Sequence, residues 1–179
     1  MELKIVTPET RQPVARGETG EILVKGPTLM EGYYKMPRGR SFDAEGFFKT
    51  GDLGAVDESG YLHFAARLKD VIKTAGINVA SVEVEEALMR HEAVEAAYVV
   101  GVADSVRGEN IAAFVVLRDG HQATADALRE LCRGSLASYK VPRHVFTIAA
   151  SAVPRTGSGK VEKAALRREA EVRAQARAK

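Results

Sequence analysis

The sequence contains no tryptophan and only one cysteine, Cys132. A single cysteine excludes a disulfide within the chain and fits the reducing cytoplasm, where we expect this protein to be located. Leu128 and Leu131 precede Cys132 at the spacing of one helical face. We therefore expect a thiol packed in the core rather than a catalytic nucleophile.

Long hydrophobic runs and a strong net charge are also missing. No apolar run approaches the roughly 18 residues that a membrane-spanning helix needs, and the first residues do not have the pattern of a signal peptide. The formal net charge is only +2, which argues against a dedicated nucleic-acid binder. The apolar share of 45% and the charged share of 28% are typical of a soluble globular protein.

The sequence shows no motif of a metal-dependent or serine hydrolase. The four histidines are scattered without metal-ligand spacing, and no serine lies in a G-x-S-x-G elbow. We therefore expect no metal site formed by this chain, and hydrolase chemistry has no support.

Two parts of the chain differ in the secondary structure that they predict. Residues 1–66 contain short β-branched runs separated by prolines and glycines, and no helix. From Ser81 onward the order is helix, strand, strand, helix, strand and helix, with Ser81 and Thr124 as expected N-caps. We expect an α+β fold, in which a small C-terminal domain over residues 67–179 has a central β-sheet with flanking helices. A β-rich segment over residues 1–66 precedes it.

The stretch from Arg67 to Val79 predicts a short basic hairpin. Residues 71–73 and 77–79 are branched and apolar enough for two strands, and residues 74–76 form the turn, which ends at Gly76. Basic side chains beside a flexible glycine suit a phosphate-bearing ligand. An ordinary surface hairpin has the same pattern.

Asp52 and Lys160 are further candidates for a functional site. Asp52 follows Lys-Thr-Gly, where we expect a tight turn, and its carboxylate either accepts two ribose hydroxyls or caps that turn. Lys160 ends the run Pro-Arg-Thr-Gly-Ser-Gly-Lys. This run is not a Walker loop, because it starts with Pro154 and has Val161 after the lysine. We expect a flexible loop that carries one mobile ammonium, or an ordinary exposed lysine. The basic helix that follows either meets phosphate or, as is usual for such a helix, presents a solvated face.

A series of motifs in a fixed order resembles the AMP-forming acyl-CoA synthetases. This superfamily includes acyl- and aryl-CoA ligases, peptide-synthetase adenylation domains and beetle luciferase. The motifs are Gly17-Glu-Thr-Gly-Glu-Ile22 with Gly26-Pro27 and Gly32-Tyr-Tyr34, Lys49-Thr-Gly-Asp-Leu53, Arg67-Leu-Lys-Asp-Val-Ile-Lys73 with Gly76-Ile-Asn-Val79, Ser81 through Leu88, Gly108-Glu109, Tyr139-Lys-Val-Pro142 and Pro154-Arg-Thr-Gly-Ser-Gly-Lys-Val161. Each motif alone is moderately specific, and the ordered set is very specific.

The resemblance implies a role for four residues in adenylation. Asp52 would bind the ribose hydroxyls of ATP or of the acyl adenylate, and Arg67 would contact the same nucleotide. Lys69 would be the hinge about which the C-terminal domain rotates between two half-reactions. Lys160 would reach the carboxylate and the α-phosphate, where a cation stabilises developing negative charge. As in the family, Lys160 is also a candidate target for a lysine acetyltransferase.

The resemblance also implies a site for the thiol acceptor. Gly76 would line the tunnel for the pantetheine arm of CoA, with Lys73 beside it, since a glycine lets a thin arm pass close to the backbone. The parent reaction would join a small-molecule carboxylic acid and ATP to give acyl-AMP, and CoA would then give the thioester.

Two features depart from the family pattern. Ala66 stands where the family usually has glycine, directly before Arg67. The chain also lacks the phosphate loop and the acyl-pocket segments of the large N-terminal domain, which would hold most of the Mg²⁺ site. Residues 1–66 resemble only the last β-rich portion of that domain. We therefore expect a C-terminal portion that is inactive alone, from a truncated gene or from a longer chain.

Two alternatives to a CoA ligase remain open. One is an adenylating ligase that loads a carrier protein. The other is a non-catalytic module that binds nucleotide, CoA or a partner chain.

Overall fold

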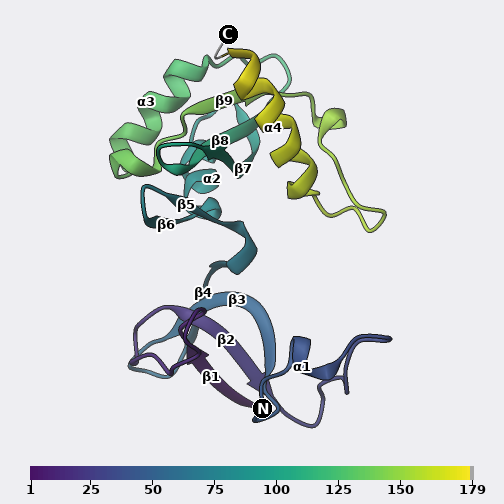
Figure 1. Ribbon diagram of the computed structural model, residues 1–179. Coiled ribbons are helices and arrows are strands. Elements are labelled where there is room, and N and C mark those ends of the chain that lie inside the picture. The colour runs from purple at the N-terminus through teal and green to yellow at the C-terminus, as the bar shows by residue number, and fades with distance from the viewer. Residues whose placement is uncertain (178–179) are drawn as a thin grey trace. The chain divides into compact units, whose positions relative to one another are not determined.

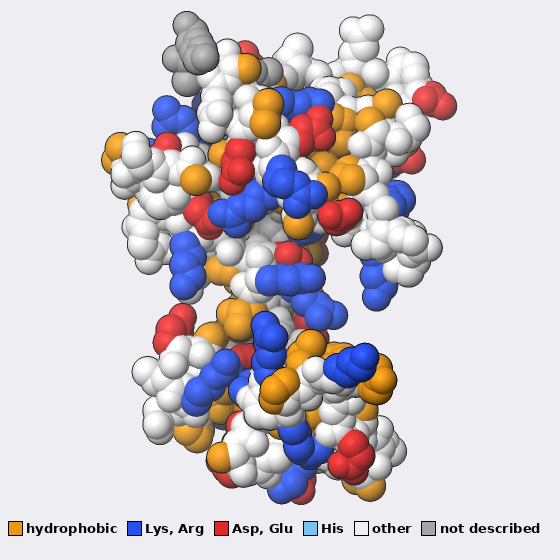
Figure 2. Space-filling model, turned by 45° about the vertical axis from the view of Figure 1, so that its right-hand side comes forward, with side chains coloured by type: hydrophobic (Ala, Val, Ile, Leu, Met, Phe, Trp, Pro, Cys, Tyr) orange, Lys and Arg blue, Asp and Glu red, His pale blue; other side chains and the backbone are white. Residues whose placement is uncertain are grey.

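A computed structural model describes residues 1–177, and the chain divides into two compact units, Met1–Lys69 (unit 1) and Asp70–Lys179 (unit 2). Each unit has its own β-sheet (Figure 1). Among the described residues, no helix is both long enough and apolar enough to span a membrane. Basic and acidic side chains are interspersed on the face that Figure 2 shows, in keeping with the net charge of +2.

Unit 1 is an antiparallel sheet with the strand order β1-β2-β3-β4. Its elements are β1 (Glu2–Val6), β2 (Gly20–Lys25), α1 (Arg38–Ser41), β3 (Phe48–Val56) and β4 (Leu62–Arg67). Val6, Leu23 and Phe47 form its small buried core. The expectation that this segment has no helix is wrong in one detail, because α1 forms a single turn that buries no residue.

The tight turn that the sequence predicts at Gly51-Asp52-Leu53 is absent, because β3 runs without reversal through these residues. Gly51 has a positive φ of 70°. In the pairing of β2 with β3, Glu21 lies opposite Leu53 and Leu23 lies opposite Lys49. Three residues of β3, 50–52, are therefore opposite the single residue Ile22 of β2. Extra residues on one strand form a β-bulge, which glycine permits by adopting positive φ. The glycine therefore marks a bulge within a strand, and Asp52 is a strand residue.

Unit 2 is a five-stranded sheet with the order β6-β5-β8-β7, in which β9 pairs in parallel with β8. Its elements are η1 (Leu68–Asp70, which begins in unit 1), β5 (Val71–Thr74), β6 (Ile77–Ala80), α2 (Ser81–Met89), β7 (Val94–Asp104), β8 (Gly108–Leu117), α3 (Ala125–Ser135), η2 (Ser138–Lys140), β9 (His144–Thr147), η3 (Ala150–Ala152) and α4 (Lys163–Arg177). The predicted order of helices and strands after Ser81 is confirmed.

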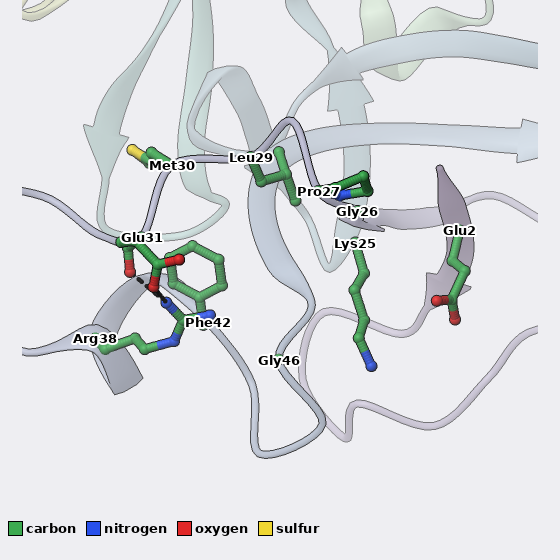
Figure 3. Close-up of a pocket in the computed structure, with 10 residues that line it drawn as sticks. All are labelled: Glu2, Lys25, Gly26, Pro27, Leu29, Met30, Glu31, Arg38, Phe42 and Gly46. Atoms are coloured by element: carbon green, nitrogen blue, oxygen red, sulfur yellow. Dashed lines mark hydrogen bonds and ion pairs between the residues drawn. The ribbon is translucent and has the colours of Figure 1, made fainter.

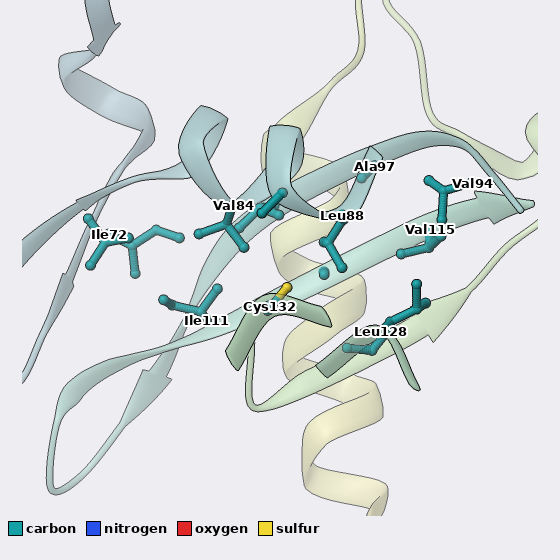
Figure 4. Close-up of a cluster of buried hydrophobic side chains, with 14 residues drawn as sticks. Ile72, Val84, Leu88, Val94, Ala97, Ile111, Val115, Leu128 and Cys132 are labelled. Carbon is teal, nitrogen blue, oxygen red and sulfur yellow. The ribbon is translucent and has the colours of Figure 1, made fainter. Parts of the chain in front are cut away.

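Helices cover both faces of this sheet, and β8 contributes to both cores. Alternate residues of a strand point to opposite faces. Accordingly, Ile111, Ala113 and Val115 join the core beneath α2 and α3, whereas Ala112, Phe114 and Val116 join the core beneath α4. Figure 4 shows the first core, where α2 and α3 direct apolar side chains toward the strands.

Cys132 lies in the first core with no exposed surface, as the sequence predicts. Burial raises the pKa of its thiol above the usual value. A raised pKa leaves little of the thiolate, which is the nucleophilic form of cysteine. Cys132 therefore serves to fill the core. The predicted N-cap of α3 is also confirmed, because the Thr124 hydroxyl accepts a hydrogen bond from the Ala127 N–H at 3.1 Å.

Leu166 of α4 provides a direct test of the second core. Its side chain is fully buried, so Leu166→Ala removes apolar contacts and leaves a cavity. We expect the free energy of unfolding of unit 2 to fall by about 2–5 kcal/mol. Denaturant unfolding of the 179-residue chain measures this change. The control is Val172→Ala on the same helix, where the side chain is 67% exposed and the expected change is about 0.5 kcal/mol or less. Equal losses in both variants would contradict the assignment of Leu166 to the core.

Candidate functional site

Asp52 and Arg67 form a cross-strand pair in unit 1. They are direct partners in the register of β3 and β4, and Arg67 Nε lies 2.7 Å from Asp52 Oδ1. Asp52 Oδ1 is buried against this guanidinium, and the contact is an ion pair without the alignment of a hydrogen bond. The Asp52 side chain as a whole is 25% exposed, so its carboxylate keeps acceptor capacity that a ligand hydroxyl can reach. The alternative role of capping a turn does not apply, because Asp52 lies in a strand.

Ala66 precedes this pair without backbone strain. It is 4% exposed, pairs with Leu53 in the sheet, and is not among the described residues with positive φ. A methyl group therefore fits at the position where the family usually has glycine. Lys69, the candidate hinge, is exposed in η1 and is the last residue of unit 1.

Lys73 and Gly76 lie on the β5–β6 hairpin of unit 2, which the sequence predicts. Ala75 and Gly76 have φ angles of 50° and 79°, so the two-residue turn has positive φ at both central positions, as a type I′ turn requires. Both candidate residues are exposed, and a Cβ built on Gly76 meets no atom within 4 Å. The hairpin tip is therefore open to a ligand.

The turn between β7 and β8 supports the tip of this hairpin. The Ala75 N–H donates to the Arg107 carbonyl at 2.7 Å. Asp104 shapes the supporting turn, because its Oδ1 accepts hydrogen bonds from the backbone N–H groups of Arg107 at 2.8 Å and Val106 at 3.0 Å. These hydrogen bonds lower the pKa of the Asp104 carboxyl below its usual value, and the one from the Arg107 N–H has the largest effect.

Lys160 is carried by a closed turn rather than by an open glycine-rich loop. The Thr156 N–H donates to the Lys160 carbonyl at 2.8 Å, and the Glu162 N–H donates to the Pro154 carbonyl at 2.9 Å. Lys160 is exposed, and its ammonium has no hydrogen bond or ion pair within the described part of the chain. The Lys160 side chain is thus a solvated cation on a turn that backbone hydrogen bonds hold in place.

Lys163 fixes the base of this turn, a role that sequence analysis missed. Its Nζ donates to Ser81 Oγ at 2.8 Å and to Glu85 Oε1 at 2.7 Å, and lies 3.9 Å from Asp70 Oδ2. The expected N-cap role of Ser81 is therefore wrong: Ser81 is the first residue of α2, and its hydroxyl binds Lys163. At least one basic residue of α4 is structural rather than part of a solvated face.

A pocket of about 360 Å³ in unit 1 contains none of these candidates. Figure 3 shows Lys25, Met30, Arg38 and Phe42 among its lining residues, with Arg38 bound to Glu31. No group of three or more potential metal-ligating side chains occurs among residues 1–177. The candidate residues therefore form separate groups within each unit: the Asp52–Arg67 pair in unit 1, and the hairpin and the Lys160 turn in unit 2.

Two family models match the sequence along most of its length. The model of the AMP-binding enzyme C-terminal domain matches residues 83–160, and the model of the AMP-binding enzyme matches residues 1–34. The chain belongs to the AMP-binding enzyme family. The resemblance that the sequence motifs indicate is thus confirmed, and so is the α+β class.

Known members of this family are similar over nearly the whole chain. The putative acyl-CoA synthetase YngI of Bacillus subtilis is 42% identical over 93% of this chain and 30% of its own length. A long-chain-fatty-acid–CoA ligase of the same organism is 43% identical over 88% of this chain and 28% of its own length. ATP-bound MatB from Rhodopseudomonas palustris is 35% identical, with a TM-score of 0.88 over 95% of this chain and 34% of MatB. The chain therefore spans about a third of the length of the relatives it matches.

Proposed function

We propose that the chain is the C-terminal part of an AMP-forming acid–thiol ligase, an acyl-CoA synthetase. This ligase activates a carboxylic acid with ATP to acyl-AMP and transfers the acyl group to CoA. The observation that carries the proposal is the 35% identity and TM-score of 0.88 to ATP-bound MatB over 95% of the chain. We call the longer protein, in which the large N-terminal domain precedes residues 1–179, the parent enzyme.

In this proposal Asp52 and Arg67 bind the nucleotide. The partial exposure of the Asp52 side chain, 25%, supports this role, because a carboxylate accepts hydrogen bonds from ribose hydroxyls. Arg67, which is 53% exposed, keeps guanidinium N–H groups free for the same ligand. The phosphates of ATP and the Mg²⁺ ion would be held mainly by the N-terminal domain.

Lys160 and Lys69 serve the adenylation step. Attack of the substrate carboxylate on the α-phosphorus, with departure of pyrophosphate, concentrates negative charge at the phosphoryl oxygens. The free ammonium of Lys160 stabilises that charge once it is brought to the nucleotide. Lys69 acts as the hinge for this movement, which its place at the end of unit 1 supports.

Lys73 and Gly76 serve the thioester step. The thiol of CoA attacks the acyl carbon of acyl-AMP, and AMP leaves with the electrons of the broken C–O bond. Gly76 gives the pantetheine arm a path close to the backbone, and the open space around its Cα supports this role. Lys73 provides an exposed cation beside that path.

The cellular setting proposed for the parent enzyme is the cytoplasm, where its small-molecule substrates are a carboxylic acid, ATP and CoA. The exposed, unpaired ammonium of Lys160 is also accessible to a lysine acetyltransferase. Acetylation removes its charge and would switch off adenylation.

A coupled pyrophosphate-release assay on the parent enzyme tests the proposed function. A panel of carboxylic acids is offered with ATP, first alone and then with CoA or a carrier protein as acceptor. We expect acid-dependent pyrophosphate release and CoA-dependent AMP release. Failure of every acid to release pyrophosphate would overturn the proposal. Transfer only to a carrier protein would identify the alternative class of ligase.

The 179-residue chain by itself is expected to form no acyl-AMP. Residues 1–179 lack the phosphate loop that resemblance assigns to the preceding domain, and adenylation requires both reactants to be held in place. ATP–pyrophosphate exchange with the same acids measures this. Exchange above background would show that these residues form a complete adenylation site.

A further inference from the structure

The carboxylate of Glu109 joins three elements of unit 2. Its Oε2 accepts a hydrogen bond from the backbone N–H of Lys73 in β5 at 2.8 Å, and its Oε1 accepts one from Arg167 Nη2 in α4 at 2.6 Å. Glu109 itself lies in β8. Its side chain is only 17% exposed, whereas that of Arg167 is 46% exposed.

The β5–β6 hairpin depends on this carboxylate because its other links to β8 are few. Thr74 and Gly108 are the one register pair between β5 and β8 among the described residues, and Ala75 binds the adjoining turn through Arg107. The backbone N–H of Lys73 donates to the Glu109 carboxylate, whereas a strand N–H usually donates to a backbone carbonyl. A hydrogen bond to an ionised acceptor is roughly twice as strong as a neutral one. Glu109 thus holds the strand on which Lys73 lies.

Gly101 of β7 provides the space that Glu109 occupies. A Cβ built on Gly101 would lie 2.8 Å from Glu109 Cδ and 2.9 Å from both carboxylate oxygens. Gly101 does not adopt positive φ, so its backbone conformation does not require glycine. Glycine inside a strand weakens the strand unless a close approach needs it. The close approach here is that of the Glu109 carboxylate.

We propose that Glu109 is a positioning residue for the thioester half-reaction. It fixes the β5–β6 hairpin, and therefore the location of Lys73 and Gly76, while Arg167 holds the second carboxylate oxygen in place. Gly101 belongs to the same arrangement because its lack of a side chain leaves space for the Glu109 carboxylate. The inference rests on the proposed function, since it assigns Glu109 to one of the two half-reactions of the parent enzyme. A displacement of about 1 Å in a positioning element is sufficient to cost about a hundredfold in rate.

Two variants disturb this arrangement in different ways. Glu109→Ala removes the carboxylate. Gly101→Ala leaves Glu109 and Arg167 in the chain but forces the carboxylate to move. Glu109→Gln is the conservative variant, because its amide oxygen still accepts from the Lys73 N–H while the ion pair with Arg167 is lost. Glu130→Ala is the matched control, since this glutamate is 73% exposed and, among the described residues, pairs only with Arg133 on α3.

The half-reactions of the parent enzyme are measured separately. Thioester formation from synthetic acyl-AMP and CoA is expected to lose about tenfold to a hundredfold in kcat/KM for CoA in Glu109→Ala and in Gly101→Ala. Glu109→Gln should recover part of this loss. ATP–pyrophosphate exchange should stay within about twofold of the wild type in all variants, because the Lys160 turn is held by its own backbone hydrogen bonds and by Lys163 rather than by Glu109. In the 179-residue chain, hydrogen exchange of the Lys73 amide should accelerate in both alanine variants and remain unchanged in Glu130→Ala.

Each other result counts against the inference. Equal slowing of both half-reactions would show that Glu109 contributes only to the stability of unit 2. Thioester formation at the wild-type rate in both alanine variants would show that Glu109 does not position the hairpin. In either case a wild-type parent enzyme that makes the thioester leaves the proposed function intact. A wild-type parent enzyme that forms neither acyl-AMP nor thioester would overturn the proposed function, and the inference with it.

Discussion

Replacing Lys160 by alanine in the parent enzyme is expected to slow acyl-AMP formation by about a hundredfold to a thousandfold. The ammonium is exposed and unpaired within the described residues, so the protein loses no internal contact when it is removed. The loss therefore reports transition-state stabilisation alone. ATP–pyrophosphate exchange measures this half-reaction.

Thioester formation from pre-made acyl-AMP and CoA should be largely spared in the same variant. Arg133→Ala is a suitable control, because it removes a 56% exposed cation from α3 and should leave both half-reactions unchanged. Acetylation of Lys160 should reproduce the selective loss, since it removes the same charge. If Lys160→Ala slowed both half-reactions equally, Lys160 would be a structural lysine and not the adenylation residue.

The opposite selectivity is expected for Gly76→Leu. A leucine side chain at the hairpin tip would occupy the path proposed for the pantetheine arm, so thioester formation should fall by about a hundredfold or more while acyl-AMP formation changes little. The φ angle of Gly76 is 79°, however, and a residue with a Cβ is strained there by about 1–2 kcal/mol whatever surrounds it. Thioester synthesis and thermal stability must therefore be measured together.

The chain contains a matched control for that strain. Gly120 has a φ angle of 75° and, like Gly76, meets nothing within 4 Å of a built Cβ. Gly120→Leu should lower stability by a similar amount and leave both half-reactions intact. Gly76→Asn adds a second comparison, because asparagine tolerates positive φ but carries a smaller side chain. Equal loss of thioester formation in Gly76→Leu and Gly120→Leu would show that strain, rather than a blocked path, is the cause.

Local sequence patterns were sufficient where neighbouring residues determine the structure. The β5–β6 hairpin follows from two short branched runs around Ala75-Gly76, because a two-residue turn with positive φ needs glycine or a similar residue. The N-cap of α3 follows in the same way from Thr124. In both cases the residues that form the feature lie within a few positions of one another.

Local patterns failed where the decisive partner is distant in sequence. Ser81 looks like an N-cap, but its hydroxyl binds Lys163, which is 82 residues away. A bulge and a turn both use a Gly-Asp pair, and only the register with β2 shows that Asp52 lies in a strand. The link from Glu109 to Lys73 spans 36 residues. The roles proposed for the six site residues came from resemblance, because spacing alone left each with a structural alternative.

The burial of Cys132 has a practical consequence for studying the two units. Because the chain's one thiol is fully buried and its pKa is raised, the native surface offers no site to a maleimide dye under mild conditions. A single cysteine introduced into each unit would therefore be labelled selectively, without first removing a native residue. Energy transfer between two such dyes would report the distance between the units directly, and would show whether ATP or CoA changes it.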